Sequence, residues 1–304
     1  MTIPDHTKKS PLSSGYIFIF ISGILWGSIG LFIKQMASSG STPVLTSFLR
    51  VFFSFVILFA ACCIRYGLKA FIIDFRTLLS CAFIGLICYG LYNITYSFSV
   101  TETGVSVSAV LLNISPVFTL IFSAVLFTEK ITPRKIAAIL INIIGCVLTA
   151  TNGQMDLRLI SAAGILAGIG AGICYSLTPI AGRLASGRTN PYSVSMYSYF
   201  FATLFLGLWM RPWSHPVEIN FRILIWGFFY GLIPTAVTYI IYYKGLQRIT
   251  ESSKVPVIAS IETVVATTIG ITLYGEHLGP ISIFGILLVL LSIIVMQSEK
   301  NRLS

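Results

Sequence analysis

The sequence has little charge. Only 10% of its 304 residues are Asp, Glu, Lys or Arg, and ten residues are acidic, whereas soluble domains carry about 25% charged residues. Hydrophobic side chains make up 56% of the chain, and the mean hydropathy is +0.89. This composition excludes an ordinary soluble domain. It indicates a membrane protein with no room for a separate soluble catalytic domain.

The sequence also lacks the motifs of nucleotide, hydrolase and metal chemistry. It contains neither the phosphate-binding pattern G-x-x-x-x-G-K-[ST] nor the serine-nucleophile pattern G-x-S-x-G. Its three histidines, His6, His215 and His277, lack the helical spacing of metal ligands. Its six cysteines fall in apolar stretches without C-x-x-C spacing, so we interpret them as small packing residues. We therefore expect no catalytic residue, no metal site and no bound cofactor.

Charges, prolines and polar clusters divide the chain into ten apolar segments. Each segment is long enough to cross the hydrocarbon core of a bilayer as a helix. The predicted fold is an all-α membrane protein with ten transmembrane helices, tails at 1–15 and 298–304, and a polar connection at Thr101–Thr103. The segments are 16–33, 43–64, 77–99, 104–127, 134–151, 159–181, 192–210, 222–243, 254–274 and 279–297.

The basic residues are distributed unevenly over the predicted connections. With the amino terminus inside, fifteen of the twenty lysines and arginines are cytoplasmic, four are outside and one, Arg50, lies within the second helix. Such an excess is typical of cytoplasmic loops, so we expect both termini in the cytoplasm. The net charge of +10 does not indicate nucleic acid binding, because the basic residues occur singly or in pairs at the ends of apolar runs. The cytoplasmic set is Lys8, Lys9, Arg65, Lys69, Arg76, Lys130, Arg134, Lys135, Arg183, Arg188, Lys244, Arg248, Lys254, Lys300 and Arg302, and the outer set is Lys34, Arg158, Arg211 and Arg222.

The pattern E-x-x-x-P follows both the fourth and the ninth segment, at an offset of 147 residues. It is formed by Glu129 and Pro133 in the first half and by Glu276 and Pro280 in the second. The halves 16–151 and 152–297 are therefore predicted to be copies of one five-helix unit. Because five is odd, the second copy enters the membrane from the opposite face, as in the inverted repeats of many secondary transporters.

These features resemble the EamA-type drug/metabolite transporter superfamily over about residues 16–297. The resemblance rests on Gly23-Ile24-Leu25-Trp26-Gly27-Ser28 with Lys34, on Leu49-Arg50-Val51, on both E-x-x-x-P junctions and on Ile261-Glu262-Thr263-Val264. One departure is Thr263, because the family usually has proline after this glutamate. The resemblance implies ten helices in two inverted repeats around a central cavity, export or exchange of small metabolites, amino acids or drugs, and a location in the cell (inner) membrane.

Glu262 is the deepest acidic residue in the predicted membrane segments. It lies eleven residues after Glu251 and fourteen before Glu276, which places it near the bilayer midplane at about 1.5 Å of rise per residue. A carboxylate there costs about 2.5–3.5 kcal/mol on insertion scales, so it should face a wet cavity, a partner or a proton. We interpret Glu262 as a proton-coupling residue or a ligand for a cationic substrate group. The alternative is a protonated packing residue.

Arg50 lies about seven residues into the second predicted helix. It would attract a substrate carboxylate or phosphate, or pair with Glu262 when no substrate is bound. The alternative is a side chain that extends to the outer surface. Lys34, at the end of the first predicted helix, is interpreted as an interfacial residue.

Aromatic and amide side chains recur along several predicted helices. Trp26 in the first helix and Tyr175 in the sixth match at an offset of 149 residues. Such rings could line a cavity for an apolar or aromatic substrate, whereas Tyr96 and Tyr243 are interpreted as residues of the interfacial aromatic belt. The predicted cavity residues are Trp26, Tyr89, Tyr92, Asn93, Asn113, Tyr175 and Tyr239, together with Glu262 and Arg50.

Small residues and prolines indicate packing seams and kinks. Gly164, Gly168 and Gly172 recur every four residues in the sixth predicted helix, a spacing that lets helix backbones approach closely. Pro116 in the fourth helix and Pro256 in the ninth lie in corresponding helices and each removes a helical hydrogen bond. We expect these two helices to be gating elements.

The sequence therefore favours a secondary transporter that moves a small organic metabolite, such as an amino acid, through the lipid bilayer by alternating access, with protons as candidate coupling ions. The alternatives are a multidrug exporter and a nucleotide-sugar or phosphorylated-metabolite carrier, although the latter usually needs several basic residues in its cavity. A lipid-modifying membrane enzyme would need a cluster of His, Asp or Glu near one face. A receptor or scaffold would need a long tail or soluble domain, and the sequence has none of these.

Overall fold

The computed structural model describes residues 14–67, 71–152, 161–210, 219–275, 277 and 279–298. This part of the chain folds into helices without a strand. It contains ten helical spans long and apolar enough to cross a membrane, which confirms the predicted number. Most of both predicted tails, Glu276 and several of the predicted loop residues lie outside the described residues. Those loop and tail residues are His6, Lys8, Lys9, Lys69, Arg158, Arg211, His215, Lys300 and Arg302.

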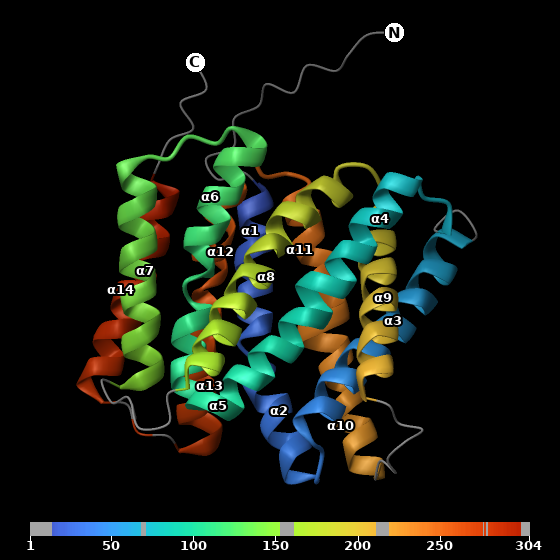
Figure 1. The fold of residues 1–304 in the computed structure, drawn as a ribbon, viewed down its shortest axis with the longest axis horizontal. Helices are drawn as coiled ribbons and strands as arrows, with labels where there is room; N and C mark the ends of the chain where they lie inside the picture. Colours follow the sequence, from blue (N-terminus) through green and yellow to red (C-terminus); the bar gives the residue numbers. More distant parts are fainter. Residues whose placement is uncertain are drawn as a thin grey trace, which may run out of the picture.

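The first half of the chain forms five spans (Figure 1). The first is divided into α1 (Ser14–Trp26) and α2 (Ile29–Ser38). The third combines α4 (Phe75–Phe83), the π-helical η2 (Ile84–Leu91) and most of α5 (Tyr92–Leu112). The second, fourth and fifth are α3 (Pro43–Tyr66), the end of α5 with α6 (Ser115–Phe127), and α7 (Pro133–Thr151).

The second half repeats this arrangement. The sixth and seventh spans are α8 (Ala162–Ser186) and α9 (Pro191–Met210). The eighth combines α10 (Phe221–Gly231), the π-helical η4 (Leu232–Val237) and α11 (Thr238–Leu246). The ninth combines η5 (Ser252–Lys254), α12 (Val255–Ala259) and α13 (Ile261–Tyr274), and the tenth is α14 (Pro280–Gln297).

Polar and left-handed residues fix where helices begin and end. The hydroxyls of Thr42 and Thr132 each accept a backbone N–H at 3.3 Å, and a proline follows each of them at the start of α3 and α7. Two other helices, α6 and α13, end at corresponding positions in the two halves. The residues that follow them, Thr128 and Gly275, adopt left-handed φ values of 54° and 64°, and this conformation ends an α-helix.

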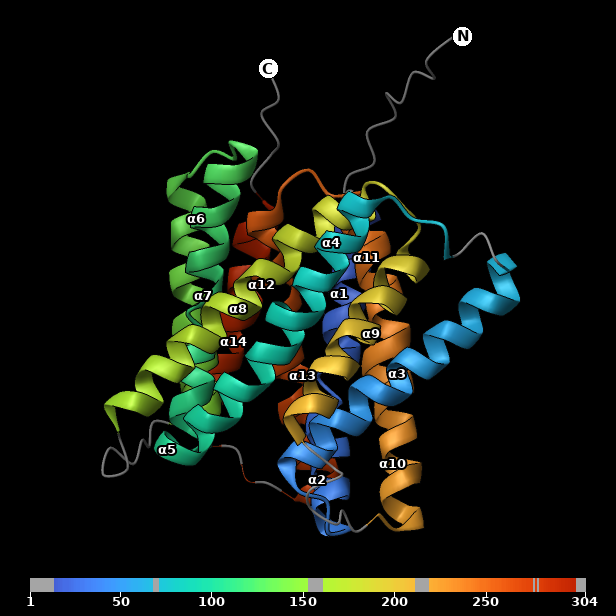
Figure 2. The same ribbon diagram turned by 45° about the vertical axis from the view of Figure 1, so that its right-hand side comes forward.

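The main helix contacts connect the two halves. α1 of the first span packs on α11 of the eighth. The symmetry-related contact joins the third and sixth spans, because α5 packs on α8. α3 packs on α9 and α7 on α14, and each of these pairs joins corresponding spans. Figures 1 and 2 show this interleaving from two directions, with the start of α1 and the end of α14 at the same end of the bundle. The arrangement is that of two inverted five-helix repeats, as predicted.

Several spans depart from regular α-helix near their middle. The π-helical segments η2 and η4 begin 148 residues apart, at corresponding places in the third and eighth spans. The first span is interrupted at Gly27–Ser28, the fourth at Asn113–Ile114 and the ninth at Ser260. Pro116 follows the fourth-span interruption directly, whereas Pro256 lies at the start of α12 and the interruption follows it. These irregular turns surround the centre of the bundle.

The predicted connection at Thr101–Thr103 is wrong, because the helix continues through it. The third span ends at Gly104, whose φ of 80° is favourable only for glycine. The hydroxyls of Thr101 and Thr103 donate to carbonyl groups one turn earlier in the same helix, at 3.1 and 2.9 Å. Their polarity is therefore satisfied within the helix and does not mark a loop.

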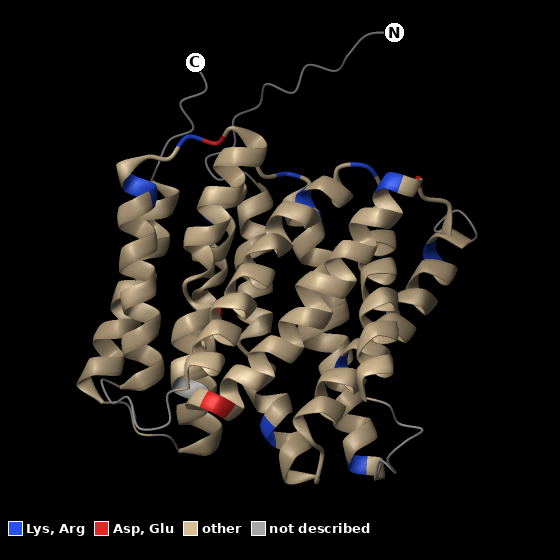
Figure 3. Cartoon of the chain, viewed as in Figure 1, with Lys and Arg blue, Asp and Glu red and all other residues tan. Residues whose placement is uncertain are grey.

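Basic residues distinguish the two ends of the bundle (Figure 3). We call the end that carries Ser14 the basic end, and the other the opposite end. Among the described residues, Lys34 on α2 and Arg222 at the start of α10 lie at the opposite end. The basic end carries Arg65, Arg76, Lys130, Arg134, Arg188, Lys244 and Arg248, as well as basic residues that are partly or fully buried.

Candidate functional site

A cavity of about 670 Å³ lies between the two halves. It begins midway along the first span, beside Trp26, and extends to Asn152 and His277 at the opposite end. Toward the basic end, Tyr175 and Pro256 are among the residues that enclose a void of only about 10 Å³, which is room for a single water molecule. The cavity is therefore closed toward the basic end.

All nine residues predicted to line a cavity do lie in the wall of this one. They are Trp26, Arg50, Tyr89, Tyr92, Asn93, Asn113, Tyr175, Tyr239 and Glu262. The two halves contribute to the same wall, since these residues come from spans in both of them. Their role in binding a substrate stays a prediction.

Glu262 lies in the first turn of α13, directly after the interruption at Ser260. Close packing against the first span positions this turn. A Cβ added to Gly23 would lie 2.6 Å from the carbonyl oxygen of Ala259, and one added to Gly27 would lie 2.9 Å from that of Glu262. Glycine is required for this approach. Within the described chain, no hydrogen bond or ion pair reaches the Glu262 carboxylate, which leaves it available to a ligand or a proton.

Arg50 reaches the cavity from α3. Its Nη1 donates to the hydroxyl of Tyr230 at 3.4 Å, and its guanidinium lies 5.4 Å from the centroid of that ring. Tyr230 stacks in turn on Phe32 of α2 at 5.8 Å. The Nε atom of Arg50 is buried without a hydrogen-bond partner among the described residues. Arg50 and Glu262 form no ion pair in this part of the chain, and the guanidinium lies inside the bundle rather than at its surface.

Aromatic rings line the cavity beside both charged residues. Trp26 packs against Tyr239 and Tyr242 at centroid distances of 5.3 and 5.1 Å. Across the cavity wall, Tyr92 packs against Tyr175 at 5.5 Å. Tilted and edge contacts of this kind restrict ring motion and favour a defined geometry. The wall therefore offers a preformed aromatic surface.

Two tyrosines that are predicted to lie in the interfacial belt pack within the bundle, where Tyr243 is buried and Tyr96 is half-buried. Tyr243 is fully buried, and its hydroxyl lies 2.6 Å from that of Tyr89. Tyr96 stacks on the cavity residue Tyr92 at 5.8 Å. The belt prediction is wrong because the third and eighth spans continue beyond their predicted ends. Lys34 is exposed, with its ammonium 3.9 Å from the centroid of the Tyr274 ring, and its interfacial position stays a prediction.

Sequence reasoning missed the polar side chains in the part of the cavity nearest the opposite end. Ser282 donates to Oδ1 of Asn152 at 3.1 Å, and Asn152 ends α7 with a φ of 48°. Isolated hydroxyl and amide residues near helix ends are common, so no pattern singles them out. The missed polar residues are Thr149, Asn152, Thr263, Thr267, His277 and Ser282.

A buried polar cluster holds the interruption of the ninth span. Asn142 of α7 donates to Oγ of Ser260 at 2.6 Å and to Oγ of Ser292 on α14 at 3.0 Å. Both serine hydroxyls donate in turn to carbonyl groups of their own helices. The cluster joins α7, α14 and the turn that precedes Glu262, so it helps to fix where this carboxylate lies.

A ten-helix bundle of inverted repeats around a charged and aromatic cavity defines a membrane transport protein. The chain belongs to the EamA-like transporter family, whose model matches residues 13–151 and 162–297. It is therefore a multi-pass transporter of the membrane, and the resemblance seen in its motifs is confirmed.

The relatives carry the same general description. The chain is 24% identical to an uncharacterized transporter of Archaeoglobus fulgidus, covering 94% of this chain and 97% of the relative. It is 23% identical to the uncharacterized inner membrane transporter YicL of Salmonella typhimurium, covering 95% and 96%. A solved crystal structure with 16% identity has the same fold, with a TM-score of 0.79 over 93% of this chain and 97% of that chain.

Proposed function

We propose that the protein is a secondary transporter that moves a small amphiphilic metabolite, such as an amino acid, by alternating access. The observation that carries this proposal is that one carboxylate, Glu262, and one guanidinium, Arg50, line the same cavity without pairing with each other. An amino acid carries the complementary ammonium and carboxylate. The rings of Trp26 and Tyr92 offer an apolar surface for its side chain.

The energetics of buried charge support this pairing. An unpaired charge at membrane depth is unfavourable unless a ligand, a counter-ion or water compensates it. A zwitterion that contacts Glu262 and Arg50 compensates both at once. Protonation is the other way to neutralise Glu262, and exchange between a substrate ammonium and a proton at this carboxylate would couple the two fluxes.

Flux measurements in proteoliposomes test the proposal. We expect uptake of labelled amino acids that responds to a pH gradient, and we expect Glu262→Gln to abolish the proton-driven accumulation while the protein stays folded. Glu102→Gln is the matched control, because Glu102 accepts a hydrogen bond from Ser161 at 2.9 Å and does not line the cavity. Unchanged proton-driven uptake in Glu262→Gln would remove this residue from coupling. Flux of another solute class, without any amino acid flux, would contradict the substrate proposal.

A multidrug exporter of organic cations is the second candidate, favoured by the aromatic wall beside a single carboxylate. Arg50 discriminates between the two, because a zwitterion needs the guanidinium whereas a cation is repelled by it. We expect Arg50→Gln to reduce amino acid transport, and the opposite effect on cation transport would favour the exporter. Arg222→Gln, exposed at the start of α10, is the control. In the described wall Arg50 is the one guanidinium, which disfavours phosphorylated substrates.

We also propose an inner-membrane location with both termini in the cytoplasm, so that the cavity extends toward the outside. The basic residues of the basic end support this orientation, because cytoplasmic connections carry the excess of Lys and Arg. Lys130 lies at the basic end of the bundle and Lys34 at the opposite end, so the variants Lys130→Cys and Lys34→Cys report on the two sides of the membrane. In intact cells, an impermeant thiol reagent should label Cys at position 34 and not at position 130, and the reverse pattern would invert the topology.

A further inference from the structure

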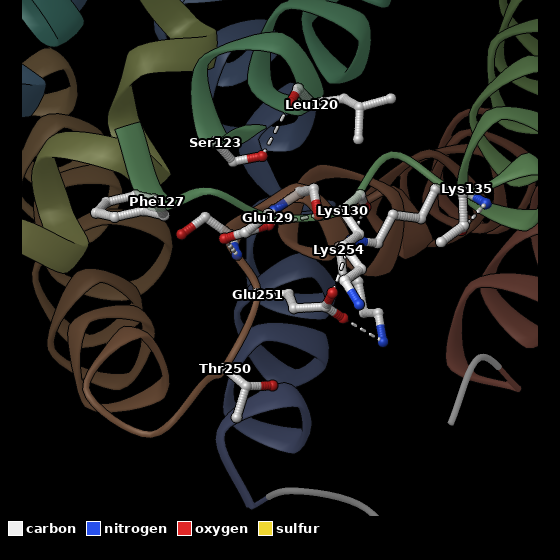
Figure 4. A network of polar contacts seen from close by, with 12 residues as sticks. Leu120, Ser123, Phe127, Glu129, Lys130, Lys135, Thr250, Glu251 and Lys254 are labelled. Atoms are coloured by element: carbon white, nitrogen blue, oxygen red, sulfur yellow. Dashed lines mark hydrogen bonds and ion pairs between the residues drawn. The ribbon is translucent and has the colours of Figure 1, made fainter. Parts of the chain in front are cut away.

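Side chains from both halves meet at the basic end, beyond the closed side of the cavity (Figure 4). Glu129, which follows α6, accepts hydrogen bonds from the backbone N–H groups of Ser252 and Ser253 at 2.6 and 3.1 Å. It also accepts one from the hydroxyl of Ser253 at 2.6 Å and one from Nη1 of Arg183 at 2.9 Å. Because the ninth span begins at Ser252, Glu129 caps a helix that belongs to the other half.

A second carboxylate extends this arrangement. Glu251 lies 2.7 Å from Nζ of Lys135 and 2.6 Å from Nζ of Lys254. The side chain of Lys135, on α7 of the first half, is 0% exposed, and that of Lys254 is 3% exposed. We call this set the basic-end network, and it consists of Glu129, Lys135, Arg183, Glu251, Ser252, Ser253 and Lys254.

Burial makes the network sensitive to helix displacement. Charges removed from water are tolerated only when they are paired and hydrogen-bonded. The network meets this condition only while the ninth span lies against α6, α7 and α8. Separation at this end would break the contacts of Glu129 with the ninth span and the ion pair between Glu251 and Lys135, and it would hydrate both carboxylates. The closed and open arrangements are therefore two discrete states.

The helices of the network are also the helices of the cavity. The ninth span runs from Ser252 through the interruption at Ser260 to Glu262. α8 carries Arg183 of the network and Tyr175 of the cavity wall. A displacement at the basic end therefore moves elements that carry predicted substrate contacts.

We propose that the basic-end network is the gate at this end of the transporter, and that the contacts of Glu129 must break before the cavity opens there. This inference rests on the alternating access proposed above, and it is independent of the substrate and the coupling ion. Glu129 acts in it as a positioning residue that contacts the ninth span and not the substrate.

Hydrogen–deuterium exchange of the full chain in lipid nanodiscs tests the gate. Glu129→Gln keeps the size of the side chain and removes its charge. We expect amide exchange over 252–259 to become at least about tenfold faster, as the loss of a charged hydrogen bond implies. We also expect exchange in α2 and the last turns of α13, at the opposite end, to become slower, because that end closes when the basic end opens. Glu102→Gln is the control and should change neither region.

The slower exchange at the opposite end is the decisive result, since a merely structural cap would not cause it. Faster exchange confined to 252–259 would overturn the gate, and so would unchanged exchange at both ends. If Glu129→Gln fails to fold, Ser253→Ala removes only the 2.6 Å hydroxyl contact with the carboxylate and should give the same reciprocal pattern at about tenfold. None of these results depends on amino acid flux, so failure of the gate and failure of the proposed function are distinguishable.

Discussion

Replacement of Asn142 by leucine should destabilise the protein without leaving an empty space. Asn142 is 2% exposed, and its amide makes the two interhelical hydrogen bonds to Ser260 and Ser292. Leucine has the same branching and the same number of side-chain heavy atoms as asparagine, so the change removes these bonds and creates no cavity. Polar contacts between membrane helices contribute about 0.6 kcal/mol each on average, so the loss of two should cost about 1.2 kcal/mol.

The free energy of unfolding, measured by SDS titration in mixed micelles, checks this value. Asn113→Leu is the matched control, because the Asn113 amide donates to Ala109 of its own helix at 2.9 Å and not to another helix. We expect Asn142→Leu to lower the free energy of unfolding by more than Asn113→Leu does. An equal or smaller loss would refute the conclusion that this cluster joins α7, α14 and the ninth span.

Three further predictions concern packing, a buried hydroxyl and pH. In Gly285→Ala, the new methyl group would lie 2.6 Å from a backbone nitrogen of α7, and this overpacking should cost about 1–3 kcal/mol in the same unfolding assay, whereas Gly170→Ala meets open space and should not destabilise. Tyr243→Phe removes a 2.6 Å contact with a second buried tyrosine hydroxyl and should cost about 1 kcal/mol; an unchanged free energy would mean that the remaining hydroxyl finds another partner. Burial raises the pKa of Glu251, but the hydrogen bonds and charges of its two lysine partners outweigh burial and hold the pKa below 4.5. The contribution of the ionised Glu251 to stability is therefore full at neutral pH and is lost as the pH falls through the lowered pKa. The melting temperatures of the wild type and Glu251→Gln should converge below pH 4.5. A difference in melting temperature that is independent of pH would contradict the stabilising role of the Glu251 ion pairs.

The spans and the residues of the cavity wall could be predicted because the bilayer constrains both. A long apolar run in lipid must form a helix, and a polar group deep in such a run must face protein or a cavity. Glu262, Arg50 and Asn113 stand out for this reason. Thr149 and Ser282 carry no such signal, because a hydroxyl can bond a carbonyl of its own helix and is tolerated on any face.

The basic-end network could not be predicted, because its partners are distant in sequence. Lys135 and Lys254 read as loop residues that mark topology, yet both are buried with Glu251 between them. Lys135 and Glu251 are 116 residues apart, and Arg183 and Glu129 are 54 apart. Such pairings depend on how the two halves pack, and a single sequence contains no periodicity that reports it.

The network also shows that the two ends of the protein are sealed by different chemistry. At the repeat offset of 147 residues, Glu251 and its two lysine partners correspond to uncharged residues. Lys135, Lys254 and Glu251 correspond to Ser282, Val107 and Gly104, whereas Glu129 corresponds to Glu276. Exchange of conformation between the halves therefore cannot recreate the ion pairs of Glu251, and the state closed at the basic end is stabilised by ion pairs that its mirror state lacks. A ligand shifts such an equilibrium only by its differential affinity for the two states. In the proposed mechanism, substrate or a proton at Glu262 must therefore bind the basic-end-open state more tightly, by at least the net stabilisation that the basic-end network provides.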